Sequence, residues 1–135
     1  MTQRIGEPVS EWSTRSQRVW AKRIYDTPDP TDGHRVLATQ YWPRGVARVS
    51  VNEYARILGP SRSLLHAFKN GDVGWAEFSE RYLDEMGGEA QQAEIHRLAK
   101  LSRSETLTVM CVCPDESICH RSLLRQLIIA FDGET

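Results

Sequence analysis

The sequence predicts a single α/β domain, and three observations lead to this expectation. The 135 residues are enough for one compact hydrophobic core and few for two. Apolar residues alternate with polar ones, as in strands, early in the chain, and a continuous apolar run lies near its end. Between them, apolar residues recur at helical spacing. We expect residues 17–135 to form the domain, preceded by a flexible arm over residues 1–16 that shows no periodic pattern.

Three extended segments are expected in the first half of the chain. Alternating residues predict a strand over Gln17–Tyr25, which ends in a loop with two prolines and an Asp-Gly pair, Thr27–Gly33. A second strand is expected over Arg35–Tyr41, followed by a turn at Trp42–Gly45. Arg48–Tyr54 predicts a third short extended piece, because its valines fall on one side.

Helices are expected in the second half. Pro60 and the Asn70-Gly71 pair bracket a short helix, because proline favours helix starts and glycine follows helix ends. The next helix carries one aromatic stripe, which we expect to pack against the sheet as core. The stripe consists of Trp75, Phe78, Tyr82 and Met86.

The last elements are a third helix, a buried strand and a final helix. The third helix is expected over about Glu89–Ser102. An unbroken apolar run predicts a buried strand over Leu107–Cys113, which Pro114 ends. Apolar residues at helical spacing then predict a helix that begins near Cys119.

The turn between this strand and the final helix gathers reactive side chains. Thr106–Arg121 holds all three cysteines, one of the four histidines and an arginine. In open α/β sheets, ligands bind beyond the carboxyl ends of the strands, where helix N-termini favour anions. A thiol at a helix N-terminus beside His120 and Arg121 should have a lowered pKa and a larger thiolate fraction. We therefore predict Cys119 and His120 as catalytic residues, with His120 acting as a general base or as the cation that holds a thiolate.

Other roles for these side chains stay open. Cys111 and Cys113 share one face of a strand, and with Cys119 they form a possible thiol cluster if the loop folds back. Cys113 and Cys119 could then form a disulfide across the loop. No metal ligands are assigned, because the CxxC spacing of zinc sites is missing. Alternatively, Cys111 and Cys113 are small buried hydrophobes, and His120 caps a helix or bonds a backbone carbonyl.

A second group of candidate residues is basic and lies in the first half of the chain. If the first two strands enter the sheet, Lys22, Arg35 and Arg44 meet near its rim, and guanidinium groups hold phosphate or carboxylate with two hydrogen bonds. The alternative is a salt-bridge network around Asp32 beside a rigid turn. The predicted ligand-binding residues are Lys22, Arg23, Asp32, Arg35, Arg44 and Arg121.

Charge and composition exclude several classes of protein. Residues 1–48 hold eight Lys and Arg against five Asp and Glu, a net +3, whereas residues 49–135 come to −4. This imbalance is smaller than that of a dedicated nucleic-acid binder, but it suits a small phosphorylated ligand. No apolar stretch approaches the roughly 20 residues of a membrane span, so no membrane association is expected. The first residues lack the apolar region of a secretory signal and the cysteines are few, so we expect a cytoplasmic protein.

Several motifs, in this order, resemble one known family. They are Ala21–Leu37, Trp42–Gly45, Pro60-Ser61, Trp75–Tyr82 and the Cys119–Arg121 triplet. Over about Val19–Ile129 the chain resembles the YeaO-like branch of domain-of-unknown-function family 488, and its Cys-His-Arg triplet is similar to a signature of the wider family. The resemblance implies a Rossmann-like three-layer domain, with a small, mostly parallel sheet flanked by helices, in a bacterial or archaeal cytoplasmic protein. It supplies no established activity, although action on nucleotides or nucleic acids is suggested for members.

Three classes of function follow. The first is a small enzyme that binds a phosphorylated, nucleotide-like ligand at the Cys-His-Arg turn. The second is a thiol-redox or metal-binding module that uses the thiol cluster. The third is a non-catalytic domain that binds nucleic acid or a protein through its basic first half. The sequence identifies no cofactor, reaction or oligomeric state.

Overall fold

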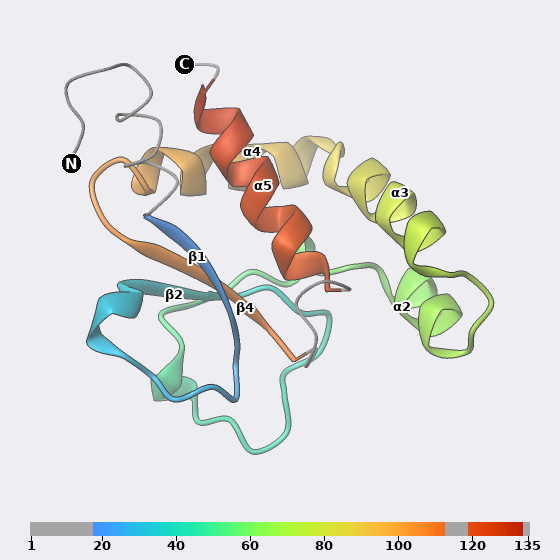
Figure 1. Cartoon of the computed structure of the whole chain (residues 1–135), viewed down its shortest axis with the longest axis horizontal. Coiled ribbons are helices and arrows are strands. Elements are labelled where there is room, and N and C mark those ends of the chain that lie inside the picture. The colour runs from blue at the N-terminus through green and yellow to red at the C-terminus, as the bar shows by residue number, and fades with distance from the viewer. Residues whose placement is uncertain (1–17, 113–118, 134–135) are drawn as a thin grey trace, which may run out of the picture.

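A four-stranded parallel sheet forms the centre of the computed structural model, which describes residues 18–112 and 119–133, the last three by their backbone alone (Figure 1). The strand order is β1-β4-β2-β3, and all three neighbouring pairs run parallel. The strands are β1 (Val19–Arg23), β2 (His34–Leu37), β3 (Glu53–Tyr54) and β4 (Leu107–Cys111). The predicted α/β fold with a small parallel sheet is confirmed.

β4 is an inner strand of this sheet. It pairs with β1 on one side and with β2 on the other, so that Val109 lies opposite both Ala21 and Val36. All five of its residues are buried. A strand covered on both faces needs apolar residues at nearly every position, which explains the continuous apolar run in the sequence.

Four helices follow the predicted order, and all four predictions are confirmed. They are α2 (Arg62–Lys69), α3 (Trp75–Met86), α4 (Glu89–Leu101) and α5 (His120–Gly133). α5 packs on β1, β4 and α4, so α4 and α5 lie over one face of the sheet (Figure 1). Ser61 caps α2, because its side chain accepts a hydrogen bond from the Leu64 amide.

The aromatic stripe of α3 belongs to the core, as expected, but it meets other helices. Phe78, Tyr82 and Met86 are buried. α3 packs mainly on α2, α4 and α5, and its stripe joins the same hydrophobic core as the buried residues of the sheet. Tyr82 is fully buried, and its hydroxyl donates a hydrogen bond to the Leu58 carbonyl at 2.6 Å.

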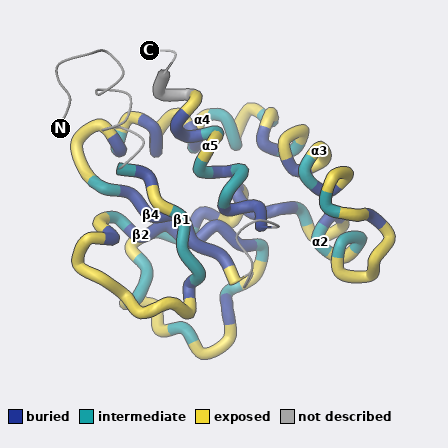
Figure 2. Tube along the Cα trace, in the orientation of Figure 1, coloured by how far each residue is buried: buried dark blue, intermediate teal, exposed yellow. Residues whose placement is uncertain are grey.

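The opposite face of the sheet is covered by an irregular segment. Leu37, Met110 and Ile24 form a small second core there, and side chains from residues 42–54 pack against it. Figure 2 shows the buried chain running through the middle of the molecule, with exposed turns around it. The two faces therefore differ, since helices cover one and loop residues cover the other.

Several predicted strand boundaries differ from the structure. β2 ends at Leu37 rather than Tyr41, because the chain then turns to pack against Gly59, where an added Cβ would lie 2.8 Å from the Gln40 amide nitrogen. Only Glu53–Tyr54 pairs with β2, and Arg48–Ser50 forms a 3-10 turn instead. The prediction of a strand over Arg48–Tyr54 was therefore wrong for its first half.

Two further 3-10 turns were not predicted. They are Pro30–Asp32 and Arg56–Leu58. Asp29 begins the first, since its side chain accepts a hydrogen bond from the Thr31 amide. Gly33 ends it at a φ of 66°, a conformation that glycine adopts easily.

Some predictions concern residues outside those described. These are the N-terminal arm over residues 1–16 and the position of Cys113. Within residues 18–112 and 119–133, no helix has the length and apolar character needed to cross a bilayer.

Candidate functional site

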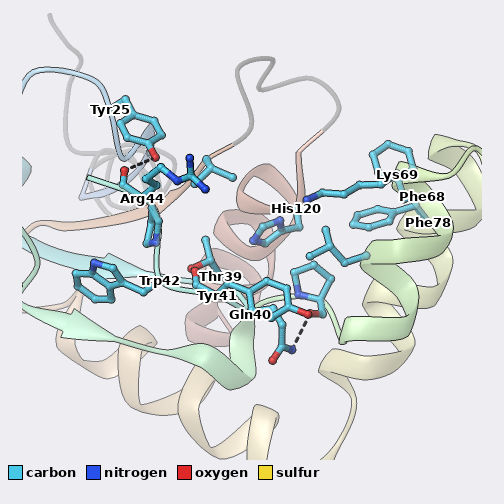
Figure 3. A pocket seen from close by; sticks show the side chains of 14 residues that line it. Tyr25, Thr39, Gln40, Tyr41, Trp42, Arg44, Phe68, Lys69, Phe78 and His120 are labelled. Carbon is cyan, nitrogen blue, oxygen red and sulfur yellow. Dashed lines mark hydrogen bonds between the residues drawn. The ribbon is translucent and has the colours of Figure 1, made fainter. Parts of the chain in front are cut away.

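A pocket of about 380 Å³ lies at the carboxyl edge of the sheet (Figure 3). Its lining includes Tyr25 beyond β1, Thr39 beyond β2, Val112 beyond β4, and His120 at the start of α5. Parallel strands end at one shared edge, so residues far apart in the sequence meet there. The pocket therefore lies beside the turn between β4 and α5, the turn at which the sequence led us to expect ligand binding.

The walls of the pocket include five aromatic side chains and two cations. Arg44 and Lys69 extend into the pocket from opposite sides (Figure 3). None of the described lining residues is acidic. The aromatic lining consists of Tyr25, Tyr41, Trp42, Phe68 and Phe78. The pocket thus combines stacking surfaces with positive charge.

Hydrogen bonds and ring contacts hold these walls in place. The Tyr25 hydroxyl donates to the Arg44 carbonyl at 2.9 Å, which ties the end of β1 to the turn at residues 42–45. The indole of Trp42 donates to the Val46 carbonyl at 2.9 Å. Phe68 of α2 packs on Phe78 of α3 with ring centroids 4.6 Å apart.

His120 is the member of the Cys-His-Arg triplet that lines the pocket. Its Nε2 lies 2.5 Å from the Ala38 carbonyl, and because a carbonyl can only accept, Nε2 carries the proton. Burial lowers the pKa of His120 to about 4, and the Arg121 charge adds to this effect against the opposing bond to Ala38. His120 is therefore a neutral imidazole near pH 7. Its hydrogen bond to Ala38 matches the alternative role that the sequence offered for it, a bond to a backbone carbonyl.

Cys119 and Arg121 lie behind the pocket, and neither lines it. Cys119 is 1% exposed, and its Sγ lies 4.0 Å from His120 Nδ1. Nη1 of the buried Arg121 lies 3.3 Å from Cys111 Sγ and 3.8 Å from Cys119 Sγ.

The sulfur atoms of Cys111 and Cys119 contact each other. Their Cα atoms are 7.9 Å apart, whereas a relaxed disulfide needs about 4.4–6.8 Å. Two of the three residues of the predicted thiol cluster are thus brought together, and the third, Cys113, is not described. The sequence had pointed to Cys113 rather than Cys111 as the partner of Cys119.

Among the described residues, three potential metal ligands lie together here. The ligand atoms of Cys111, Cys119 and His120 lie within 4.8 Å of one another. A structural zinc site needs four ligands, and the described residues offer three. The Arg121 guanidinium beside the sulfurs also opposes a cation.

Three of the predicted ligand-binding residues form a network away from the pocket. Lys22 Nζ lies 3.0 Å from the Asp32 carboxylate, and Arg35 Nη1 forms a short ion pair with the same group. Burial would raise the pKa of Asp32, but hydrogen bonds from Lys22, the Asp29 amide and Arg35 outweigh it and hold the pKa below its ordinary value. None of these three residues lines the pocket. The arrangement matches the salt-bridge network around Asp32 that the sequence offered as the alternative to ligand binding.

The remaining predicted residues divide between the pocket and its surroundings. Arg44 lines the pocket. Arg23 does not, but its guanidinium carbon lies 5.4 Å from the ring centre of Tyr25, which does. Lys69 was missed, because the sequence shows it only as the last residue of a short helix. Its place at the pocket follows from the packing of α2 near the carboxyl edge of the sheet.

The fold and the pocket place the chain in the class of α/β domains that have a parallel sheet and a pocket at the carboxyl edge of that sheet. Sequence comparison then identifies the family. The chain belongs to the DUF488 family, because the family model described as the Active DUF488-N3 subclade matches residues 19–130. The assignment made from its motifs is thus confirmed.

Several relatives are similar over most of their length. The uncharacterized protein YeaO of Escherichia coli (strain K12) is 33% identical over 108 residues, which cover 78% of this chain and 92% of YeaO. The uncharacterized proteins Rv3073c of Mycobacterium tuberculosis (strain ATCC 25618 / H37Rv) and Mb3100c of Mycobacterium bovis (strain ATCC BAA-935 / AF2122/97) are each 30% identical over 116 residues, covering 84% of this chain and 96% of theirs. No solved structure matches the chain significantly.

Proposed function

We propose that this protein is a small enzyme that binds a phosphorylated, nucleotide-like ligand in the pocket at the carboxyl edge of the sheet. The lining of the pocket carries the proposal. Aromatic rings supply surfaces on which a nucleobase stacks, and two cations supply partners for a phosphate. A volume of about 380 Å³ also lies within the usual range for small-molecule sites.

Each side of the pocket has a role in this proposal. Arg44 and Lys69 hold the phosphate, since they extend from opposite sides and none of the described lining residues is acidic. Tyr25 and Tyr41 are 48% and 45% exposed, so they offer ring surface to a base. His120 is fixed by Ala38 and orients the ligand from the floor of the pocket.

Contact with the ligand is assigned to His120 rather than to Cys119. His120 is the member of the triplet that lines the pocket, and its Nε2–H is held by the Ala38 carbonyl while its Nδ1 lies 4.0 Å from Cys119 Sγ. Cys119 and Arg121 support it from behind as positioning residues. The family description, an active subclade, agrees with an enzyme.

Calorimetric titration with adenosine 5′-monophosphate and with adenosine tests the proposal. We expect the monophosphate to bind at least tenfold more tightly, because adenosine has no phosphate for the cations. Lys69→Ala should weaken monophosphate binding about tenfold, since a charged hydrogen bond contributes about 1.5 kcal/mol or more, and should leave adenosine binding unchanged. Lys100→Ala is the matched control, because Lys100 is an exposed lysine of α4 outside the pocket. Equal binding of both compounds, or no effect of Lys69→Ala, would contradict the proposal.

A second candidate function is a thiol-redox module, and the contact between Cys111 and Cys119 favours it. Arg121 beside both sulfurs would support the attacking thiolate in exchange with an external disulfide. Thiol titration of a Cys113→Ser variant tests this candidate with oxidised glutathione as the oxidant. Loss of two thiols with release of two equivalents of reduced glutathione would support it, and two unchanged thiols would remove it.

A further inference from the structure

We propose that the nucleotide held in the pocket is part of a single-stranded nucleic acid, whose neighbouring phosphates lie on arginines around the pocket. This inference rests on the proposed function, because it assumes that the pocket receives a nucleotide. It adds the class of substrate, a strand rather than a free mononucleotide.

Arginines stack on the rings that line the pocket. Each of three aromatic lining residues has a guanidinium within 6 Å of its ring centre, which is the range of a cation–π contact. We call these three arginines the arginine rim. The pairs are Arg23 on Tyr25 at 5.4 Å, Arg48 on Trp42 at 4.6 Å and Arg62 on Tyr41 at 5.9 Å.

The charge around the pocket exceeds what a mononucleotide needs. The arginine rim, Arg44 and Lys69 together supply five positive charges, whereas a nucleoside monophosphate carries at most two negative ones. Residues 18–69, which include all five, hold nine Lys and Arg against four Asp and Glu, a net +5. Residues 70–112 hold four against eight, a net −4. Positive charge is thus concentrated in the segment that supplies most of the pocket lining, and further phosphates would match the cations of this segment that lie around the pocket.

The pairs also extend across the sheet. Arg23 ends β1, and Arg56, just beyond β3, lies 5.7 Å from the Tyr54 ring centre. β1 and β3 are the two edges of the sheet, three strand spacings apart. At about 4.8 Å per spacing, Arg–aromatic pairs span roughly 14 Å along the carboxyl edge. A path of this length accommodates several nucleotides rather than one.

A single strand fits these contacts better than a duplex. The bases of a duplex are paired and stacked inside the helix, so one of them would have to be flipped out to enter the pocket. An unpaired strand offers its bases to aromatic rings and its phosphates to arginines at the same time. Alternating rings and guanidinium groups are the surface that such a strand requires.

Fluorescence anisotropy with a labelled ten-nucleotide RNA of mixed sequence tests the inference. For single strands, log affinity falls with log salt concentration with a slope of about −0.7 for each phosphate contact. Five contacts predict a slope of about −3.5, or about 100-fold weaker binding at 200 mM than at 50 mM salt. Arg62→Ala should reduce the slope by about 0.7 and weaken RNA binding more than adenosine monophosphate binding. Arg81→Ala, an exposed arginine of α3 outside the pocket, is the matched control and should change neither.

The outcomes separate this inference from the proposed function. If the monophosphate binds but the RNA binds no more tightly, the inference fails and the proposed function stands. If the same RNA annealed to its complement binds as well as the free strand, the single-strand specificity is wrong. If neither ligand binds, both proposals fail. A double Arg48→Ala/Arg62→Ala variant whose circular dichroism matches the wild type but whose salt slope is unchanged also overturns the inference.

Discussion

Replacing Asp32 with alanine should destabilise the protein by about 3 kcal/mol, because it leaves two cations without their partner. Asp32 is 5% exposed and accepts hydrogen bonds from Lys22 and Arg35. Removing one partner of a buried ion pair costs about 3–5 kcal/mol. We expect the lower end of that range, since the side chain of Lys22 is 23% exposed and water can reach it. Arg35 is 9% exposed and cannot be rehydrated in the same way.

Urea unfolding followed by circular dichroism measures this loss. Glu77→Ala is the control, because Glu77 also pairs with an arginine, Arg81, but its side chain is 49% exposed. An exposed pair contributes about 0–1 kcal/mol, so the control should change stability little. A loss below 1 kcal/mol for Asp32→Ala would refute the reasoning. Lys22 and Arg35 would then not depend on Asp32 and would again be candidates for binding a ligand.

Three further predictions concern His120, Tyr82 and Gly33. Burial holds the pKa of His120 at about 4, against about 6.5 in the unfolded chain. The unfolded chain therefore takes up the proton first, and about 3 kcal/mol of stability is lost as the pH falls from 6.5 to 4. Urea unfolding of His120→Gln across that pH range should lack this loss. Tyr82→Phe should cost about 1–3 kcal/mol in the same assay, since the buried Leu58 carbonyl loses its donor. Gly33→Ala should lower the melting temperature, because its Cβ would lie 2.3 Å from the Thr106 carbonyl oxygen at a positive φ; an unchanged melting temperature would contradict this.

Much of the fold could be predicted from the sequence, because its signals are local. The continuous apolar run of β4 and the helical spacing in α3 and α4 follow directly from burial. The third extended segment could not be placed correctly, since only two of its residues find a partner strand. Pairing depends on residues distant in the sequence, which a local pattern does not record.

The site was only partly predictable for the same reason. The Cys-His-Arg triplet marked the edge of the sheet at which the pocket lies, because a strand-to-helix turn in a parallel sheet lies there. The sequence did not show which of its side chains would reach the pocket, and His120 does while Cys119 does not. Lys22 and Arg35 had suitable chemistry, but Asp32, between them in the sequence, bonds both.

The position of the bound nucleotide tests the central claim most directly. We would titrate the isotope-labelled protein with adenosine 5′-monophosphate and follow the amide and indole signals by nuclear magnetic resonance. The proposal predicts that the largest shifts occur in residues 39–44, in Phe68 and Lys69, and in the Trp42 indole, while residues 89–105 stay unchanged. Saturable shifts concentrated in residues 89–105, or no shifts at millimolar nucleotide, would contradict it.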